Sequence, residues 1–106
     1  MPRSYSEPFL IELYKANPNR AGVALALACV KANLPAKFIA DVLDVTRMTV
    51  FSWFRGKPIR EKNLLKVEVL TDLIESDTAK GVLPVRSIKG AKAYLEDMVG
   101  RKIGDK

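Results

Sequence analysis

The sequence predicts an all-α protein, and two observations carry this prediction. Apolar residues recur at intervals of three and four positions in six successive segments, the spacing that places side chains on one face of a helix. Helix caps and helix breakers separate these segments, for example Ser6, Thr46 and Ser87 as caps and Gly56 as a breaker. Only residues 82–86 have the composition of an extended segment.

The first two helices are expected before residue 34. The first spans about residues 7–16, where Ser6 is the N-cap and Pro8 is tolerated in the first turn. The Asn-Pro-Asn sequence at 17–19 ends this helix. The second helix, at residues 20–33, is strongly apolar, so it is expected at the centre of the core.

The next two helices, at residues 36–43 and 47–55, are joined by a tight turn and form the most informative part of the chain. Their inward positions are apolar: Ile39, Ala40, Leu43, Val45, Val50 and Trp53. Thr46 is expected to cap the second helix by accepting a hydrogen bond from a free backbone N–H. The outward positions are polar or basic: Arg47, Thr49, Ser52 and Arg55. Residues 36–55 therefore predict a helix-turn-helix, whose second helix is shaped to lie in the DNA major groove.

Two further helices are expected after Gly56 and Pro58, which end the preceding helix. A helix at residues 61–75 has its inner side assigned to six residues: Leu64, Leu65, Val67, Leu70, Leu73 and Ile74. A last helix at residues 88–99 is capped by Ser87. Residues 1–81 are thus expected to form the helix-turn-helix bundle and residues 82–106 a C-terminal extension. Two roles stay open for the extension, packing within the chain or serving as a dimerisation or docking helix, through Ile88, Ala91, Leu95 and Met98.

Composition restricts the classes of function. With one cysteine, Cys29, and no histidine, the chain lacks the residues for an internal disulfide, for the usual zinc clusters and for histidine-based triads. No enzyme activity, metal or cofactor is therefore expected. The longest apolar run, at residues 21–30, is shorter than the roughly 20 residues that span a bilayer. A cytoplasmic, nucleoid-associated location without membrane contact is expected.

The charge distribution indicates the kind of partner. The net charge is +6 and the isoelectric point is about 9.6, which favours nucleic acid. Between residues 46 and 62, five basic residues accompany a single acid, Glu61. The basic residues are Arg47, Arg55, Lys57, Arg60 and Lys62. The positive charge is therefore concentrated at the second helix of the predicted helix-turn-helix.

Residues 20–74 resemble the phage repressor and Cro family of regulators, also called lambda-repressor-like or XRE-type. The resemblance rests on Ile39-Ala40, on the segment from Leu43 to Arg47 and on the segment from Trp53 to Pro58. It implies a lambda-repressor-like helical bundle, to which this chain adds an N-terminal helix and a C-terminal helical extension. It also implies a sequence-specific DNA-binding transcriptional regulator from a phage or mobile element. The chain departs from the family pattern at Ala36, Asp44 and Phe54, where glutamine, glycine and glutamate are frequent.

Carried over position by position, the resemblance implies two sets of contacts with double-stranded DNA, bound by one chain or by a homodimer. Base edges would be contacted by Arg47, Met48, Thr49 and Ser52. Phosphates would be contacted by Lys37, Arg55, Lys57 and Arg60. Phe51 and Phe54 are expected to offer an exposed aromatic surface to a partner. Two alternatives are a helix-turn-helix protein that binds a protein, such as the transcription machinery, and a small subunit of a phage DNA-packaging complex.

Overall fold

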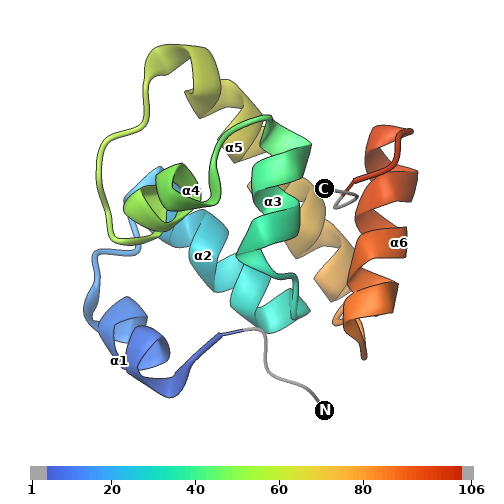
Figure 1. Ribbon diagram of the computed structural model, residues 1–106. Coiled ribbons are helices and arrows are strands. Elements are labelled where there is room, and N and C mark those ends of the chain that lie inside the picture. Colours follow the sequence, from blue (N-terminus) through green and yellow to red (C-terminus); the bar gives the residue numbers. More distant parts are fainter. Residues whose placement is uncertain (1–4, 104–106) are drawn as a thin grey trace.

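The computed structural model describes residues 5–103, which contain six α-helices (Figure 1). They are α1 (Glu7–Lys15), α2 (Ala21–Ala32), α3 (Ala36–Leu43), α4 (Arg47–Phe54), α5 (Glu61–Ala79) and α6 (Ile88–Val99). No strand occurs among the described residues, so the predicted all-α class is confirmed. The helices make a rounded molecule with extents of 30, 29 and 28 Å along its principal axes.

Most helix ends lie where the capping residues predict them. Ser6, Thr46 and Ser87 each accept a hydrogen bond from the backbone N–H three residues further along the chain. Asn33 and Asp44 adopt the left-handed conformation directly after α2 and α3, which is a common way to end a helix. The observed bounds of five of the six helices lie within one residue of the predicted bounds, and α5 is the exception. Local sequence therefore determines most of the helix ends.

Helix α2 lies at the centre of the core, as predicted, and packs against α1, α4 and α5 (Figure 1). One close approach of α2 to a neighbouring helix is at Gly22. A Cβ atom at this position would lie 2.2 Å from the carbonyl oxygen of Trp53, and real Cβ atoms essentially never come within 3.0 Å of such an atom. The missing side chain of Gly22 thus lets the backbone of α4 rest directly on α2.

Helix α5 is longer than predicted and buries only part of the predicted inner face. It continues past Glu75 to Ala79, and its buried residues are Val67, Leu70, Thr71 and Ile74. The Thr71 hydroxyl donates to the carbonyl of Val67, so its polar group is satisfied within the helix. The assignment of Leu65 and Leu73 to the inner side is wrong, because these side chains are 70% and 45% exposed. The apolar residues of α5 form two adjacent stripes, of which one reaches the core.

The C-terminal segment packs into the same core as the rest of the chain. Residues 82–86 form no strand, but Leu83 is buried and the backbone N–H of Val85 donates to the carbonyl of Ala32, at the end of α2. Ala91 and Leu95 of α6 are also buried, and α6 packs on α3. The inner face of α6 is therefore filled within the chain, while Ile88 at its start is half exposed.

Candidate nucleic-acid interface

The α3–α4 pair is built around a three-residue connection, Asp44 to Thr46. Asp44 has φ 57° and ψ 48°, the left-handed region, which aspartate enters more readily than most residues. The N–H of the next residue, Val45, donates to the carbonyl of Ala40 over 3.0 Å and closes the turn. Thr46 then caps α4 by accepting from the N–H of Thr49 over 3.1 Å. These contacts define the turn between α3 and α4, which pack against each other.

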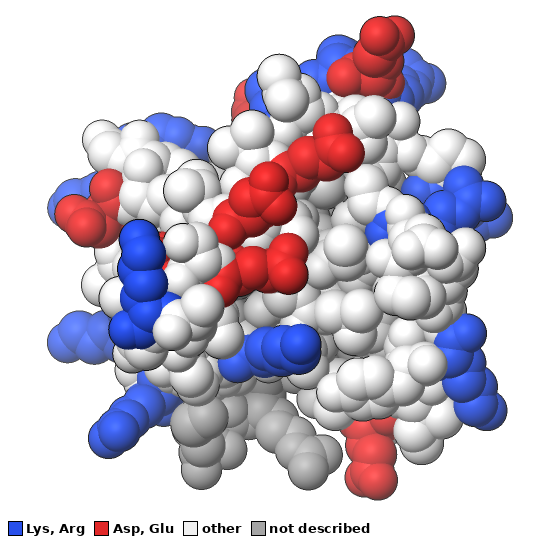
Figure 2. Space-filling model, turned by 180° about the vertical axis from the view of Figure 1, so that it is seen from behind, with Lys and Arg blue, Asp and Glu red and all other residues white. Residues whose placement is uncertain are grey.

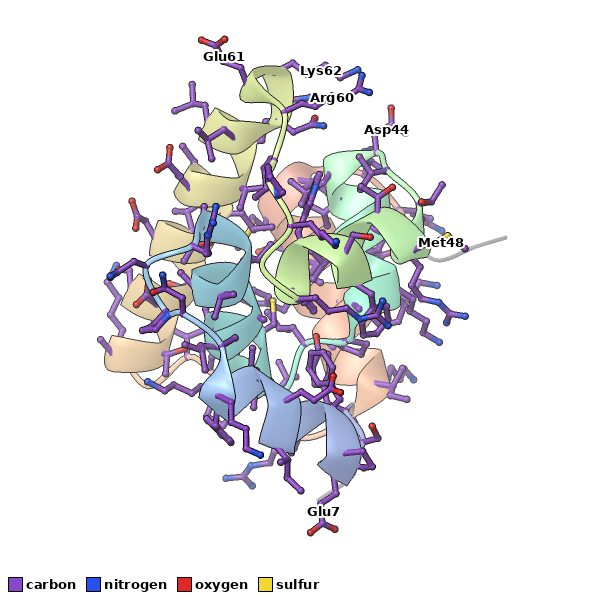
Figure 3. The ribbon with its side chains drawn as sticks, turned by 90° about the vertical axis from the view of Figure 1, so that its left-hand side faces the viewer. Glu7, Asp44, Met48, Arg60, Glu61 and Lys62 are labelled. Atoms are coloured by element: carbon purple, nitrogen blue, oxygen red, sulfur yellow. The ribbon has the colours of Figure 1, made fainter. Side chains whose placement is uncertain are left out.

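Helix α4 is divided into two halves with different surroundings. Its inner and C-terminal residues Val50, Trp53 and Phe54 are buried. Its N-terminal residues Arg47 and Met48 are exposed, and Met48 is the most exposed large hydrophobic side chain of the described residues, at 81%. Figure 3 shows Met48 projecting away from the body of the protein at the start of α4, near Asp44. The start of α4 is therefore open to a partner.

The other two residues predicted to contact bases are less accessible. Thr49 and Ser52 are both half-buried. The Thr49 hydroxyl is paired with the Thr46 hydroxyl over 2.9 Å, so it is already hydrogen-bonded. Of the four predicted base-contacting residues, Arg47 and Met48 are therefore exposed, and Thr49 and Ser52 are only partly accessible.

The expectation that Phe51 and Phe54 are exposed is wrong. Phe54 is 1% exposed and Phe51 is half-buried, because both pack against α1 in an aromatic cluster. The ring centroid of Phe9 in α1 lies 5.7 Å from that of Phe51 and 6.1 Å from that of Phe54. The Tyr5 ring stacks on Phe9 at 5.3 Å. The N-terminal helix thus covers the aromatic side of α4 and removes Phe54 from contact with any partner.

Exposed cations surround α4 at its C-terminal end and beyond. Arg55 follows the helix directly, and the N–H of Lys57 donates to the carbonyl of Ser52, which folds the connection back beside α4. The connection then leads to the start of α5, where Arg60 and Lys62 project outward (Figure 3). Three of the predicted phosphate-contacting residues thus lie within residues 55–60 and are all exposed: Arg55, Lys57 and Arg60.

Two more cations flank the pair of helices. The fourth predicted phosphate-contacting residue, Lys37, is exposed near the start of α3, and its Nζ lies 5.0 Å from the ring centroid of Phe38. Sequence reasoning missed Arg20, which is exposed just before α2. Its Cγ lies 4.0 Å from the position that a Cβ atom at Gly56 would occupy, so Arg20 sits beside the basic connection. No local signal marks Arg20, because 36 positions of chain separate it from Gly56.

A hollow of about 550 Å³ lies beside the turn between α3 and α4. Its charged lining residues are Lys37, Asp41, Asp44 and Arg47. The guanidinium of Arg101, from the C-terminal segment, donates to the carbonyl of Asp41 over 2.6 Å and so braces the end of α3. The two carboxylates give this side of the surface a mixed charge, in contrast to the basic connection after α4.

The buried reactive groups of the described chain are away from this surface and serve the core. Tyr5 donates a hydrogen bond to the carbonyl of Leu34. Burial raises the pKa of Tyr5 and of Cys29, so both side chains are neutral at physiological pH. A buried, protonated thiol is a weak nucleophile.

No protein-family model, curated protein or solved structure matches this chain. Within residues 5–103, no group of three or more acidic, cysteine or histidine side chains is placed to hold a metal ion. None of the helices in that range is long and apolar enough to cross a membrane. The geometry of α4 and its basic surroundings is therefore the main basis for a functional proposal.

Proposed function

We propose that the chain binds double-stranded DNA through α4 and acts as a sequence-specific transcriptional regulator. The observation that carries the proposal is the division of α4. Its N-terminal end presents Arg47 and Met48 to solvent, and the exposed cations Arg55, Lys57 and Arg60 follow the helix in the chain. A helix with an open N-terminal end suits the major groove, which is about 12 Å wide and admits an α-helix.

Two residues at the start of α4 carry the proposed sequence recognition. The guanidinium of Arg47 can donate two parallel hydrogen bonds to O6 and N7 of guanine, a pair worth roughly 1–3 kcal/mol of discrimination against other bases. Met48 is apolar and suits contact with a thymine methyl group. Thr49 and Ser52, being half-buried, would contact DNA only along the surface of the helix.

The cations around α4 would set affinity rather than sequence preference. Lys37, Arg55, Lys57 and Arg60 were predicted for this role, and the position of Arg20 beside Gly56 adds a fifth cation. Each phosphate contact releases counterions, so the binding constant falls with salt at a logarithmic slope of about −0.9 per contact. The carboxylates of Asp41 and Asp44, beside the turn before α4, would repel phosphates. This repulsion would help to orient the protein on the duplex.

A fluorescence anisotropy titration with random-sequence duplex at about 50 and 200 mM salt tests DNA binding. Five phosphate contacts predict a loss of affinity of about 10²- to 10³-fold between these conditions. Lys57→Ala should weaken binding to all sequences and lower the salt slope by about one. The matched control is Lys89→Ala, an exposed lysine on α6, which should leave binding unchanged.

Sequence recognition needs a second test, on an operator selected from a random library. Arg47→Ala should relax the preference at one base position of the selected site while leaving non-specific binding nearly intact. Equal losses on selected and random DNA would contradict the role of Arg47. No binding at the lower salt concentration would contradict the proposal as a whole.

The two alternatives have less support. A protein-binding role was expected to use Met48, Phe51 and Phe54. Met48 is 81% exposed, but Phe51 is half-buried and Phe54 is buried, so most of the expected aromatic surface is missing. A subunit of a DNA-packaging ring would assemble beyond a dimer, so the mass of the chain in solution distinguishes it from the regulator.

A further inference from the structure

Helix α5 carries an apolar stripe that the described part of the chain leaves open. Its members Leu65, Val69 and Leu73 recur at four-residue intervals, and their side chains are 70%, 48% and 45% exposed. Residues four apart are neighbours on a helix surface, so these side chains form one row about 12 Å long, at about 1.5 Å of rise per residue. No other described helix has three exposed large hydrophobic residues.

The stripe forms one wall of a groove of about 400 Å³ between α5, α3 and α6. Val42 of α3 and Met98 of α6 contribute to the other walls, and Lys66 alone among the lining residues is not apolar. An extended apolar surface of this kind on a small protein is typical of a binding face. No residue of α4 lines the groove, which is therefore distinct from the candidate DNA-binding surface.

The outer edge of the stripe is acidic, although the chain as a whole has a net charge of +6. Exposed Glu68 and Asp72 lie directly beside the stripe, three positions after Leu65 and Val69 respectively. Residues 67–79 contain four acids and no lysine or arginine, a net charge of −4. Figure 2 shows acidic side chains gathered across the middle of the rear face.

The cations near the groove lie on its other side. Lys66 is on the opposite edge of the stripe from Asp72, since the two residues stand three positions before and after Val69. Arg101 is at the α3 wall, where its guanidinium donates to the carbonyl of Asp41 at the end of that helix. The charge along the groove is therefore one-sided, and an occupant that spans the stripe meets carboxylates along its α5 edge.

The composition of the groove selects a helix over an extended peptide. Peptides that bind as an added strand need an exposed sheet edge, and residues 5–103 contain no strand. Proline-rich peptides bind in aromatic-lined grooves, and no aromatic residue lines this one. An amphipathic helix laid in an apolar groove is the remaining common mode, and its i, i+4 side chains repeat at the same interval as the stripe.

Charge determines which kind of helix fits. Nucleic acid and anionic lipid would bring phosphates against Glu68 and Asp72. A second α5 would bring its own net charge of −4 to the contact. A cationic amphipathic helix instead covers the apolar stripe and places lysine or arginine over the two carboxylates.

We propose that the α5 groove binds a cationic amphipathic helix of another protein. The apolar side chains of that helix pack on Leu65, Val69 and Leu73, and its basic edge lies over Glu68 and Asp72. The start of α4 stays uncovered, so the chain can hold this partner and a DNA duplex at the same time. The proposal does not rest on DNA binding.

The test uses the full chain without DNA and synthetic peptides of roughly 18 residues, about five helical turns. One peptide has leucines along one helix face and lysines on the other, and a second has glutamate in place of each lysine. Anisotropy of the labelled lysine peptide should give a dissociation constant of about 10 μM. The glutamate peptide should bind at least about tenfold more weakly, as should a lysine peptide whose leucines are scrambled off one face.

A first double variant tests the apolar stripe. Leu65→Gln with Leu73→Gln removes two apolar side chains without changing the charge, and glutamine has nearly the helix propensity of leucine. Affinity for the lysine peptide should fall by about tenfold or more. The matched control is Val82→Gln with Ile88→Gln, at residues that are 57% and 50% exposed and outside the groove. It should stay within about twofold of the unaltered protein.

A second double variant tests the acidic edge. Glu68→Lys with Asp72→Lys should reverse the preference, so that the glutamate peptide binds at least about tenfold more tightly than the lysine peptide. The matched control is Glu7→Lys with Glu12→Lys, which makes the same change in net charge at exposed residues of α1, outside the groove. It should keep the preference for the lysine peptide. Circular dichroism should show unchanged helix content, since all the altered side chains are exposed.

Three results would overturn the proposal. One is a lysine peptide that does not bind, or binds no better than its scrambled form, which would leave no role for the stripe. Another is binding that both α5 variants leave unchanged, which would place the peptide elsewhere on the surface. The third is a chain that sediments as a dimer and becomes a monomer of 11.8 kDa with Leu65→Gln and Leu73→Gln, which would assign the groove to a second copy.

Discussion

Replacing Gly22 by alanine should push α4 away from α2. The added Cβ atom would lie 2.2 Å from the Trp53 carbonyl oxygen and 2.6 Å from its carbonyl carbon, whereas ordinary contact begins at 3.4 Å. The two helices must therefore separate by about 1 Å, and the obstacle is main chain, which cannot rotate away. Val50, Trp53 and Phe54 would lose part of their packing in the core.

The magnitude follows from two opposing effects. Overpacking a core typically costs about 1–3 kcal/mol, and the upper end applies here because backbone is displaced. Alanine offsets up to about 1 kcal/mol through its higher helix propensity. The free energy of unfolding should thus fall by about 2 kcal/mol, and the melting temperature by roughly 10 °C for a chain of this size.

Urea unfolding followed by circular dichroism measures the effect. The matched control is Gly90→Ala in the first turn of α6, where the nearest atoms would be Ser87 Oγ at 3.3 Å and Val85 Cβ at 3.7 Å. That variant should stay within about 0.5 kcal/mol of the unaltered protein. If Gly22→Ala were equally harmless, the direct contact between α2 and the α4 backbone would not determine how α4 is seated.

Three further predictions concern the turn at Asp44, the buried ionisable side chains of Cys29 and Tyr5, and the aromatic cluster. Asp44→Gly should stabilise the fold by about 0.5–1 kcal/mol in urea unfolding, because glycine enters the left-handed region without strain. The same variant should bind random duplex more tightly in an anisotropy titration, because a carboxylate is removed from the surface. Burial raises the pKa of Cys29 and Tyr5, so the folded state holds their protons more tightly than the unfolded chain. Their contribution to stability is fully present below the ordinary pKa values, 9.0 for Cys29 and 10.0 for Tyr5, and is lost as the pH rises above them. The free energy of unfolding should then fall by up to about 1.4 kcal/mol per pH unit for each group. Unfolding free energies that stay constant from pH 8 to 11 would contradict this. Phe9→Ala should cost about 2 kcal/mol in urea unfolding because it removes the centre of the aromatic cluster, whereas the control Tyr14→Ala, at a residue 68% exposed, should cost less than about 0.5 kcal/mol.

The helix ends were predictable because their signals are local. A cap such as Thr46 contacts a backbone N–H three residues away, so the sequence around it contains the whole interaction. Asp44 likewise ends α3 through its own backbone conformation. The positions of Arg47 and Met48 at an exposed helix start follow from the same local rules.

The burial of side chains on α4 and α5 could not be predicted in the same way, because it depends on partners that are distant in the sequence. Phe51 and Phe54 are covered by Phe9, more than 40 positions earlier in the chain, and periodicity within α4 does not contain that information. On α5, both the buried stripe and the exposed stripe are apolar at helical spacing. Which of them faces the core is decided by how α2 and α3 pack, so Leu65 and Leu73 could not be assigned from the helix alone.

The two halves of α4 are under different structural constraints. Arg47 and Met48 contribute little to the core, and substitutions at such exposed positions usually change stability by less than about 0.5 kcal/mol. Trp53 and Phe54 are fixed by Gly22 and by the rings of α1. The exposed start of α4 can therefore be changed by saturation mutagenesis of residues 47 and 48, while the buried residues of the helix preserve the fold.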